Sequence, residues 1–196
     1  TVVIDNSSAF RLDPDVPLVV PEVNADDIAK HNGIIANPNC STIIMTLAIA
    51  PIHRQAGIKR VVVNTCQAVS GAGKAAIDEL YAQLDALLDN KPPKAEILPV
   101  AALNEHYPIA FNLIPQIDVF VEDGYTKEEM KLVLETRKIM NLPDLAVTAT
   151  TVRVPVLRSH SEMINLELER KLTADHARAV LSKAPGVIVC DEPENQ

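Results

Sequence analysis

The stretch AVTATTVRVPVLRSHSEMINLEL, residues 146–168, decides the fold class. Residues 146–157 and 163–168 alternate between apolar and polar side chains, which is typical of β-strands with one buried face. The two segments follow one another without a helix between them. Adjacent strands of this kind, in a chain that also contains helices, favour an α+β lobe with a mixed or antiparallel sheet over a doubly wound unit.

The other elements are predicted outward from this stretch. Further strands are expected at residues 2–4, 18–20, 34–35, 60–65, 118–121 and 187–190. Helices are expected at residues 25–31, 41–56, 74–88, 126–140 and 173–182. Thr126 and Glu129 form a capping box at one helix start. Gly57 is a good C-terminal stop, and Pro51 should kink the helix before it or end that helix early.

Length, charge and apolar content exclude several classes of protein. The 196 residues are 47% apolar, enough for a core, and the formal net charge of −8 argues against a nucleic-acid partner. The longest apolar run, residues 43–52, is far shorter than the roughly 20 residues that cross a bilayer. We therefore expect a globular protein without a membrane span.

Three cysteines, at positions 40, 66 and 190, show no CxxC motif and no spacing typical of a metal site. Reduced thiols in the cytoplasm are the expectation, with neither a disulfide framework nor a bound metal. The chain begins at Thr1, inside an apolar run, and is interpreted as an excerpt of a longer protein. It contains no GxGxxG after a strand, so the pyrophosphate loop of any dinucleotide site would lie outside it.

Cys40 lies in the segment NPNCST, residues 37–42, directly before an apolar helical run. A thiol at a helix start is exposed to free backbone amides and to the helix dipole, and both favour the thiolate. Cys40 is therefore a candidate nucleophile, and a buried inert thiol is the alternative. Cys66 and Cys190 fit core positions better.

Two further groups suit an anionic substrate that exchanges a proton. Arg153 and His160 lie at the two ends of one segment, although a surface arginine and a surface histidine would give the same pattern. Glu128 and Lys131 share a face in the first turn of a helix, where a solvated ion pair is the simple interpretation. The segment SGAGK, residues 70–74, lacks the first glycine and the hydroxyl of a Walker loop.

Several motifs together, in this order along the chain, resemble those of the bacterial aspartate-β-semialdehyde dehydrogenases. They are VIDNSSAFR (3–11), PEVN (21–24), NPNCSTI (37–43), VVVNTCQAVSGAGK (61–74), EExK (128–131) and RVPVLRSHSE (153–162). The resemblance implies that Cys40 is the acyl-forming nucleophile and His160 the acid/base. It also implies a set of substrate-binding residues, namely Gln67, Glu128, Arg153 and Asn39.

The same resemblance implies that Arg11 and Lys131 bind phosphate, and that Ser70 and Gly71 approach the nicotinamide end of NADP. The mechanism implied for this chain is thiolate attack on the aldehyde, hydride transfer to NADP⁺ and cleavage of the thioester by phosphate. The physiological direction would be the reverse, from aspartyl phosphate to semialdehyde, in the biosynthesis of lysine, methionine, threonine and diaminopimelate. No metal is expected.

The resemblance also implies a domain plan. Residues 1–38 would end an NADP-binding Rossmann-like domain. Residues 39–196 would form a catalytic and dimerisation domain of the glyceraldehyde-phosphate-dehydrogenase-like type, within a homodimer or homotetramer. The excerpt should hold the catalytic residues without a complete NADP site, and so should not turn over alone.

Three other classes of protein are alternatives to this interpretation. A related acyl-phosphate or acyl-CoA reductase shares the thioester strategy, but one such family typically has a glycine before its cysteine, where this chain has Asn39. A glyceraldehyde-phosphate dehydrogenase would have two threonines and an asparagine after the nucleophile. A catalytically dead paralogue acting as a scaffold is disfavoured because both Cys40 and His160 are present.

Overall fold

The structure is a computed structural model that describes residues 1–192 and 194. The chain folds into two compact units. Unit 1 comprises Thr1–Val62, Lys131–Val147 and Ile164–Gln196, and unit 2 comprises Val63–Met130 and Thr148–Met163. The chain is mixed α/β, as predicted.

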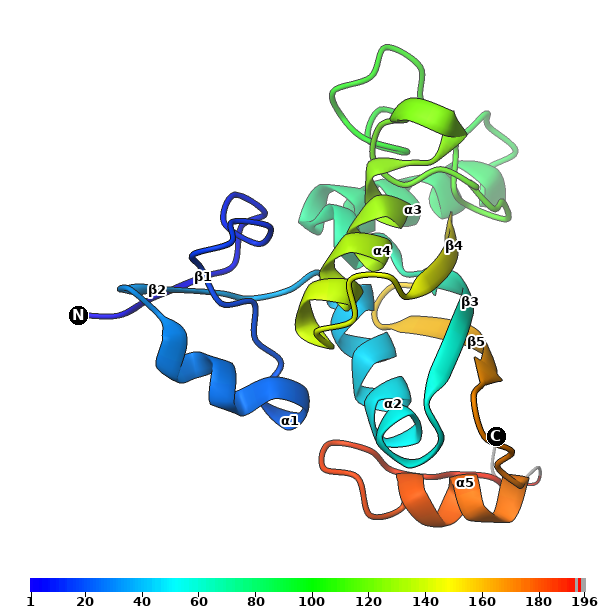
Figure 1. The fold of residues 1–196 in the computed structure, drawn as a ribbon. Helices are drawn as coiled ribbons and strands as arrows, with labels where there is room; N and C mark the ends of the chain where they lie inside the picture. Colours follow the sequence, from blue (N-terminus) through cyan, green and yellow to red (C-terminus); the bar gives the residue numbers. More distant parts are fainter. Residues whose placement is uncertain (193, 195–196) are drawn as a thin grey trace. The chain divides into compact units, whose positions relative to one another are not determined.

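Unit 1 begins with a small parallel sheet. Strand β1 (Val3–Asp5) pairs with β2 (Ile34–Ala36), with Val3 opposite Ile34, and Figure 1 shows the two strands side by side. The strand predicted at residues 18–20 is reduced to a single bridge between Leu18 and Ala36. The predicted helix at residues 25–31 is a 3₁₀ helix, η1 (Ala25–Lys30), which directly follows α1 (Pro21–Asn24).

The cysteine helix α2 (Cys40–Ala56) is the longest helix of unit 1 among the described residues, and α5 (Ala174–Leu181) packs against it (Figure 1). Of the two outcomes expected for Pro51, a kink or an early end of the helix, the early end is wrong, because α2 continues through Pro51 to Ala56. It ends at Gly57, whose φ of +69° favours glycine. A Cβ at Gly57 would also overlap the side chain of Glu169.

Three strands form the second sheet, in the order β4 (Ala146–Arg153), β3 (Ile58–Gln67) and β5 (His160–Leu168). The two strands predicted from residues 146–168 therefore exist with no helix between them. The first is shorter than predicted, ending before Pro155, which has no N–H to donate to a ladder. The second begins earlier than predicted, at His160.

In unit 2 a short 3₁₀ turn, η2 (Val69–Ala72), leads into α3 (Lys74–Leu88), which matches its predicted range. Leu80 of α3 packs in a core with Leu98 and Ile109. The buried Gln83 side chain holds the irregular segment that follows: its Oε1 accepts from the Ile109 and Ala110 amides at 2.9 and 3.0 Å. The Gln83 side chain thus supplies a hydrogen-bond acceptor for two backbone amides of a segment that belongs to no sheet.

Helix α4 (Lys127–Ile139) follows a second 3₁₀ turn, η3 (Glu122–Gly124). The predicted capping box is confirmed: the Glu129 amide donates to Thr126 Oγ1 at 3.3 Å, and Glu129 Oε2 accepts from the Thr126 amide at 2.7 Å. The strand predicted at residues 118–121 is wrong, since only Phe120 forms a bridge, with Thr126. The strand predicted at 187–190 is also wrong, because those residues join no sheet.

Candidate active site

The predicted site residues divide between the two units. Unit 1 contains Arg11, Asn39, Cys40 and Lys131, and unit 2 contains Gln67, Ser70, Gly71, Glu128, Arg153 and His160. Cys40 and His160 belong to different units, and their approach to each other stays a prediction.

Cys40 is the first residue of α2, as its sequence context predicts, and it is exposed, so the buried-thiol alternative is wrong. Asn39 is the N-cap, in extended conformation, and its Oδ1 accepts from the amides of Ser41 and Thr42 at 3.0 and 3.3 Å. An asparagine cap fixes the first turn, where the amides and the helix dipole favour an anion. The thiol therefore lies where a thiolate is stabilised and where a ligand can reach it.

The backbone of Asn39 is held by a residue that the sequence did not single out. Its N–H donates to Oε2 of Glu135 at 2.7 Å, and Glu135 is buried on α4. The only sequence signal for Glu135 was its spacing. One face of α4 carries Lys131, Glu135 and Lys138, at i, i+4 and i+7. Such a charged stripe is ordinarily solvated, so the pattern alone did not identify Glu135.

Arg11 is nearly buried and is held on several sides. Its Nη1 lies 3.2 Å from Glu135 Oε1, and its Nη2 donates to the Asn6 carbonyl at 3.3 Å. Its Nε has no hydrogen-bond acceptor within the described part of the chain. A buried guanidinium with a remaining donor fits the predicted role in anion binding. Lys131, the second predicted phosphate ligand, is half-buried on α4.

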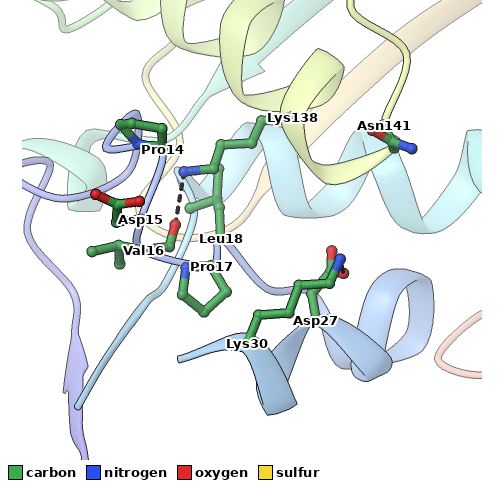
Figure 2. A pocket seen from close by; sticks show the side chains of 9 residues that line it. All are labelled: Pro14, Asp15, Val16, Pro17, Leu18, Asp27, Lys30, Lys138 and Asn141. Carbon is green, nitrogen blue, oxygen red and sulfur yellow. Dashed lines mark hydrogen bonds and ion pairs between the residues drawn. The ribbon is translucent and has the colours of Figure 1, made fainter. Parts of the chain in front are cut away.

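Lys138 fixes the segment that follows Arg11. Its Nζ donates to the backbone carbonyls of Arg11, Asp13 and Val16 at 2.9, 2.6 and 2.8 Å, and Figure 2 shows the last of these bonds. Desolvation lowers the pKa of Lys138, and the charge of Asp13 opposes this shift. The three carbonyls use all three ammonium hydrogens, so Lys138 has a structural role here.

The cavity beside Lys138, about 480 Å³, contains none of the predicted site residues. Its lining includes Lys30 and Asp27, which pair with each other, and this pairing lowers the pKa of Asp27 (Figure 2). Lys30 and Asp27 thus compensate each other's charge, and Lys138 is already bonded to three backbone carbonyls.

In unit 2, Arg153 and His160 converge on the turn that follows β3. The Ala68 amide donates to His160 Nδ1 at 3.1 Å, and Arg153 Nη1 donates to the Ala68 carbonyl at 2.7 Å. A Cβ at Gly71 would lie 2.8 Å from Arg153 Nη1 and 3.4 Å from His160 Cε1. A side chain at position 71 would therefore force Arg153 to shift, and the surface alternative for Arg153 is wrong, since this residue is buried.

The pKa of His160 is lowered, chiefly by burial and also by the charge of Arg153, while the Ser159 backbone and Glu128 act in the opposite direction. The imidazole is therefore neutral near pH 7. Because Nδ1 accepts from Ala68, the neutral ring carries its hydrogen on Nε2. His160 is thus arranged to donate a hydrogen bond through Nε2.

Gln67 and Glu128 form a buried pair. Gln67 Nε2 lies 3.2 Å from Glu128 Oε1 and 3.3 Å from Thr65 Oγ1, and both residues of the pair are at most 5% exposed. The solvated ion pair considered for Glu128 and Lys131 is therefore wrong for Glu128. Ser70 is half-buried on η2, and its amide donates to the Leu157 carbonyl at 3.2 Å.

Comparison with known proteins identifies the family. The family described as "Semialdehyde dehydrogenase, dimerisation domain" matches residues 49–196, and "Semialdehyde dehydrogenase, NAD binding domain" matches residues 1–31. The chain belongs to the semialdehyde dehydrogenase family. The boundary between domains at residues 38 and 39 stays a prediction.

Individual semialdehyde dehydrogenases are similar along the whole chain. The aspartate-semialdehyde dehydrogenase of Bacillus subtilis is 53% identical over 196 residues, and that of Aquifex aeolicus 58% identical over 197 residues. The crystal structure of aspartate semialdehyde dehydrogenase II from Vibrio cholerae matches with a TM-score of 0.88 at 50% identity and covers 94% of this chain. The chain spans 57%, 56% and 54% of these three proteins.

Three further properties hold for residues 1–192 and 194. No helix among them is both long and apolar enough to cross a bilayer. No group of three or more of their His, Cys, Asp and Glu residues could hold a metal ion. Their three cysteines are thiols and form no disulfide.

Proposed function

We propose that the protein that carries this chain interconverts L-aspartate 4-semialdehyde and L-4-aspartyl phosphate, using NADP and phosphate. The observation that carries the proposal is the position of Cys40, exposed as the first residue of α2 behind an asparagine cap. A thiol in this position is nucleophilic at neutral pH, and its ester keeps an acyl group reactive towards phosphate.

The covalent chemistry takes place at Cys40. The thiolate attacks the aldehyde carbon, and an S–C bond forms as the carbonyl π bond breaks, which gives a thiohemiacetal oxyanion. When bound, NADP⁺ would supply the two-electron oxidant that takes the hydride from that carbon. The thioester left on Cys40 is cleaved when a phosphate oxygen attacks its carbon, and the thiolate leaves as aspartyl phosphate is released. The reverse sequence forms the semialdehyde.

His160 serves the substrate oxygen in this scheme. Its neutral ring is oriented through Nδ1 by the Ala68 amide, and Nε2–H is the donor. That hydrogen stabilises the oxyanion of the thiohemiacetal and can protonate it in the reductive direction. His160 could take the thiol proton through Nε2 only in the tautomer that carries its hydrogen on Nδ1. The N-terminus of α2 therefore contributes more than His160 to forming the Cys40 thiolate.

The substrate carries an α-carboxylate and an α-ammonium group, and unit 2 provides a partner for each. Arg153 is the donor for the carboxylate, because guanidinium groups bind carboxylates with two parallel bonds. Glu128 is the acceptor for the ammonium, and Gln67, which contacts Glu128 at 3.2 Å, orients both. Asn39 contributes from the turn before the nucleophile.

Phosphate is assigned to Arg11 and Lys131. Arg11 has guanidinium N–H groups beyond the two that bond Glu135 and Asn6, and these are the proposed donors for the phosphate oxygens. Two cations at one site overcome the acidity of the chain as a whole.

The turn at Ser70 and Gly71 fits the nicotinamide end of the cofactor. Gly71 is exposed although its neighbours Arg153 and His160 lie close to it, so the backbone there is accessible beside the proposed acid. Absence of a Cβ lets a flat ring approach the turn. The same proposal includes a preference for NADP over NAD. It also includes self-association as a homodimer or homotetramer and a cytoplasmic location.

The test is phosphate-dependent NADP reduction by aspartate semialdehyde in the protein at its full natural length. Cys40→Ser should lose at least several orders of magnitude in kcat, because a nucleophile contributes several kcal/mol. Cys66→Ser, at a half-buried thiol in β3, is the matched control and should retain activity. A loss of less than about tenfold for Cys40→Ser is incompatible with the covalent mechanism.

A further inference from the structure

Glu135 links two parts of the proposed site through one carboxylate. Its Oε1 contacts Arg11 Nη1 at 3.2 Å, and its Oε2 accepts from the Asn39 amide at 2.7 Å. Its side chain is only 2% exposed. The partners are 124 and 96 residues away along the chain, so a single side chain of α4 joins two distant segments of unit 1.

The first link concerns the orientation of Arg11. Glu135 holds Nη1 and the Asn6 carbonyl holds Nη2, so the two ends of the guanidinium plane are fixed. Lys138, one turn further along α4, holds the Arg11 carbonyl at 2.9 Å. These two bonds use two of the five guanidinium N–H groups, so the three that remain, Nε–H among them, have fixed directions. A fixed donor binds an anion better than a mobile one, because no side-chain entropy is lost on binding.

The second link concerns the turn that carries the nucleophile. Asn39 is the N-cap of α2, and its Oδ1 caps the helix only if its backbone keeps the observed extended conformation. The bond to Glu135 fixes that backbone on its N–H side. The position of Cys40, the next residue, follows from it.

We propose that Glu135 is a positioning residue that holds the phosphate-binding arginine and the cysteine turn in one fixed arrangement. The inference rests on the proposed function for the identity of the anion. Glu135 itself contacts neither substrate nor phosphate in this scheme. Its ionised carboxylate is needed because two donors, one of them charged, converge on it. A glutamine amide at this position would offer one accepting oxygen and one NH₂ group, so one of the two donors would lose its acceptor.

The experiment compares three variants of the protein at its full natural length. Glu135→Gln removes the charge, and Glu135→Asp keeps it on a shorter side chain. Glu129→Gln is the matched control, since Glu129 is buried on the same helix and accepts from the Thr126 and Thr151 amides at 2.7 and 3.0 Å. Cooperative urea unfolding identifies any variant that does not fold.

Two measurements follow. In turnover, Glu135→Gln should raise the KM for phosphate about tenfold, the lower end of the effect of losing a hydrogen bond to a charged group. The KM for the aldehyde should change less than about twofold, and Glu135→Asp should recover part of the loss. Without turnover, inorganic phosphate should slow alkylation of Cys40 by iodoacetamide, and Glu135→Gln should need about tenfold more phosphate for half-protection.

Equal effects of Glu135→Gln and Glu129→Gln, or an unchanged phosphate requirement in Glu135→Gln, would overturn the inference. Phosphate-dependent turnover without any protection of Cys40 by phosphate would also overturn it, and would leave the proposed function intact. The opposite pattern, with the predicted protection but no semialdehyde turnover, would support the role of Glu135 and reject the proposed function.

Discussion

Gly71→Ala tests the convergence of Arg153 and His160 most sharply. The added Cβ would lie 2.8 Å from Arg153 Nη1, closer than carbon and nitrogen approach without bonding, and 3.4 Å from His160 Cε1, which is tolerable. Arg153 therefore has to move, while His160 hardly does. The movement breaks the 2.7 Å bond from Nη1 to the Ala68 carbonyl, and a buried bond of this charged kind contributes about 1.5–3 kcal/mol.

The expected result is a rise of about tenfold to a hundredfold in the KM for aspartate semialdehyde, because Arg153 is the proposed carboxylate donor. Gly73→Ala is the control. Position 73 has open space around it but a φ of +90°, so alanine there should cost about 1–2 kcal/mol of stability without changing that KM. Initial rates and urea unfolding of both variants separate the two effects. An aldehyde KM within about twofold of wild type in Gly71→Ala would refute the reasoning.

Three further predictions concern stability. Asn39→Ala should lower the free energy of unfolding by about 1 kcal/mol, because the amides of α2 lose their cap; an unchanged urea midpoint would contradict this. Gln83→Leu should cost about 3 kcal/mol, since two buried amides lose their acceptor, and calorimetry should show a clear drop in Tm. Burial raises the pKa of Glu162 to about 8, so the folded protein keeps a proton that the unfolded carboxyl has released above about pH 5. Stability should therefore fall as the pH rises from about 5 to about 8, and Glu162→Gln should flatten urea midpoints across that window.

Local signals made part of the fold predictable. The capping box of α4 and the helix start at Cys40 each lie within about one helical turn, so the sequence shows them directly. The strand at residues 187–190 failed for the opposite reason. An apolar run of four residues becomes a strand only if a neighbour pairs with it, and no local pattern supplies that neighbour.

The site was predictable to the extent that its motifs are contiguous. The helix-start position of Cys40 followed from its neighbours. The burial of Glu128 did not, because its spacing to Lys131 is also that of an exposed ion pair. Glu135 was missed because its two partners are 124 and 96 residues away. The crowding around Gly71 was also not predictable, since it arises from side chains of residues 153 and 160 that only the fold brings to the turn.

The most direct test of the central claim is to trap the acyl group on Cys40. The protein at its full natural length is mixed with aspartate semialdehyde and NADP⁺ without phosphate, quenched in acid and digested for peptide mass analysis. The account predicts an aspartyl thioester on the Cys40 peptide, one NADPH formed per group trapped, and loss of the group when phosphate is added. NADP reduction with Cys40 unmodified, or the group found on Cys66 or Cys190 instead, would contradict it.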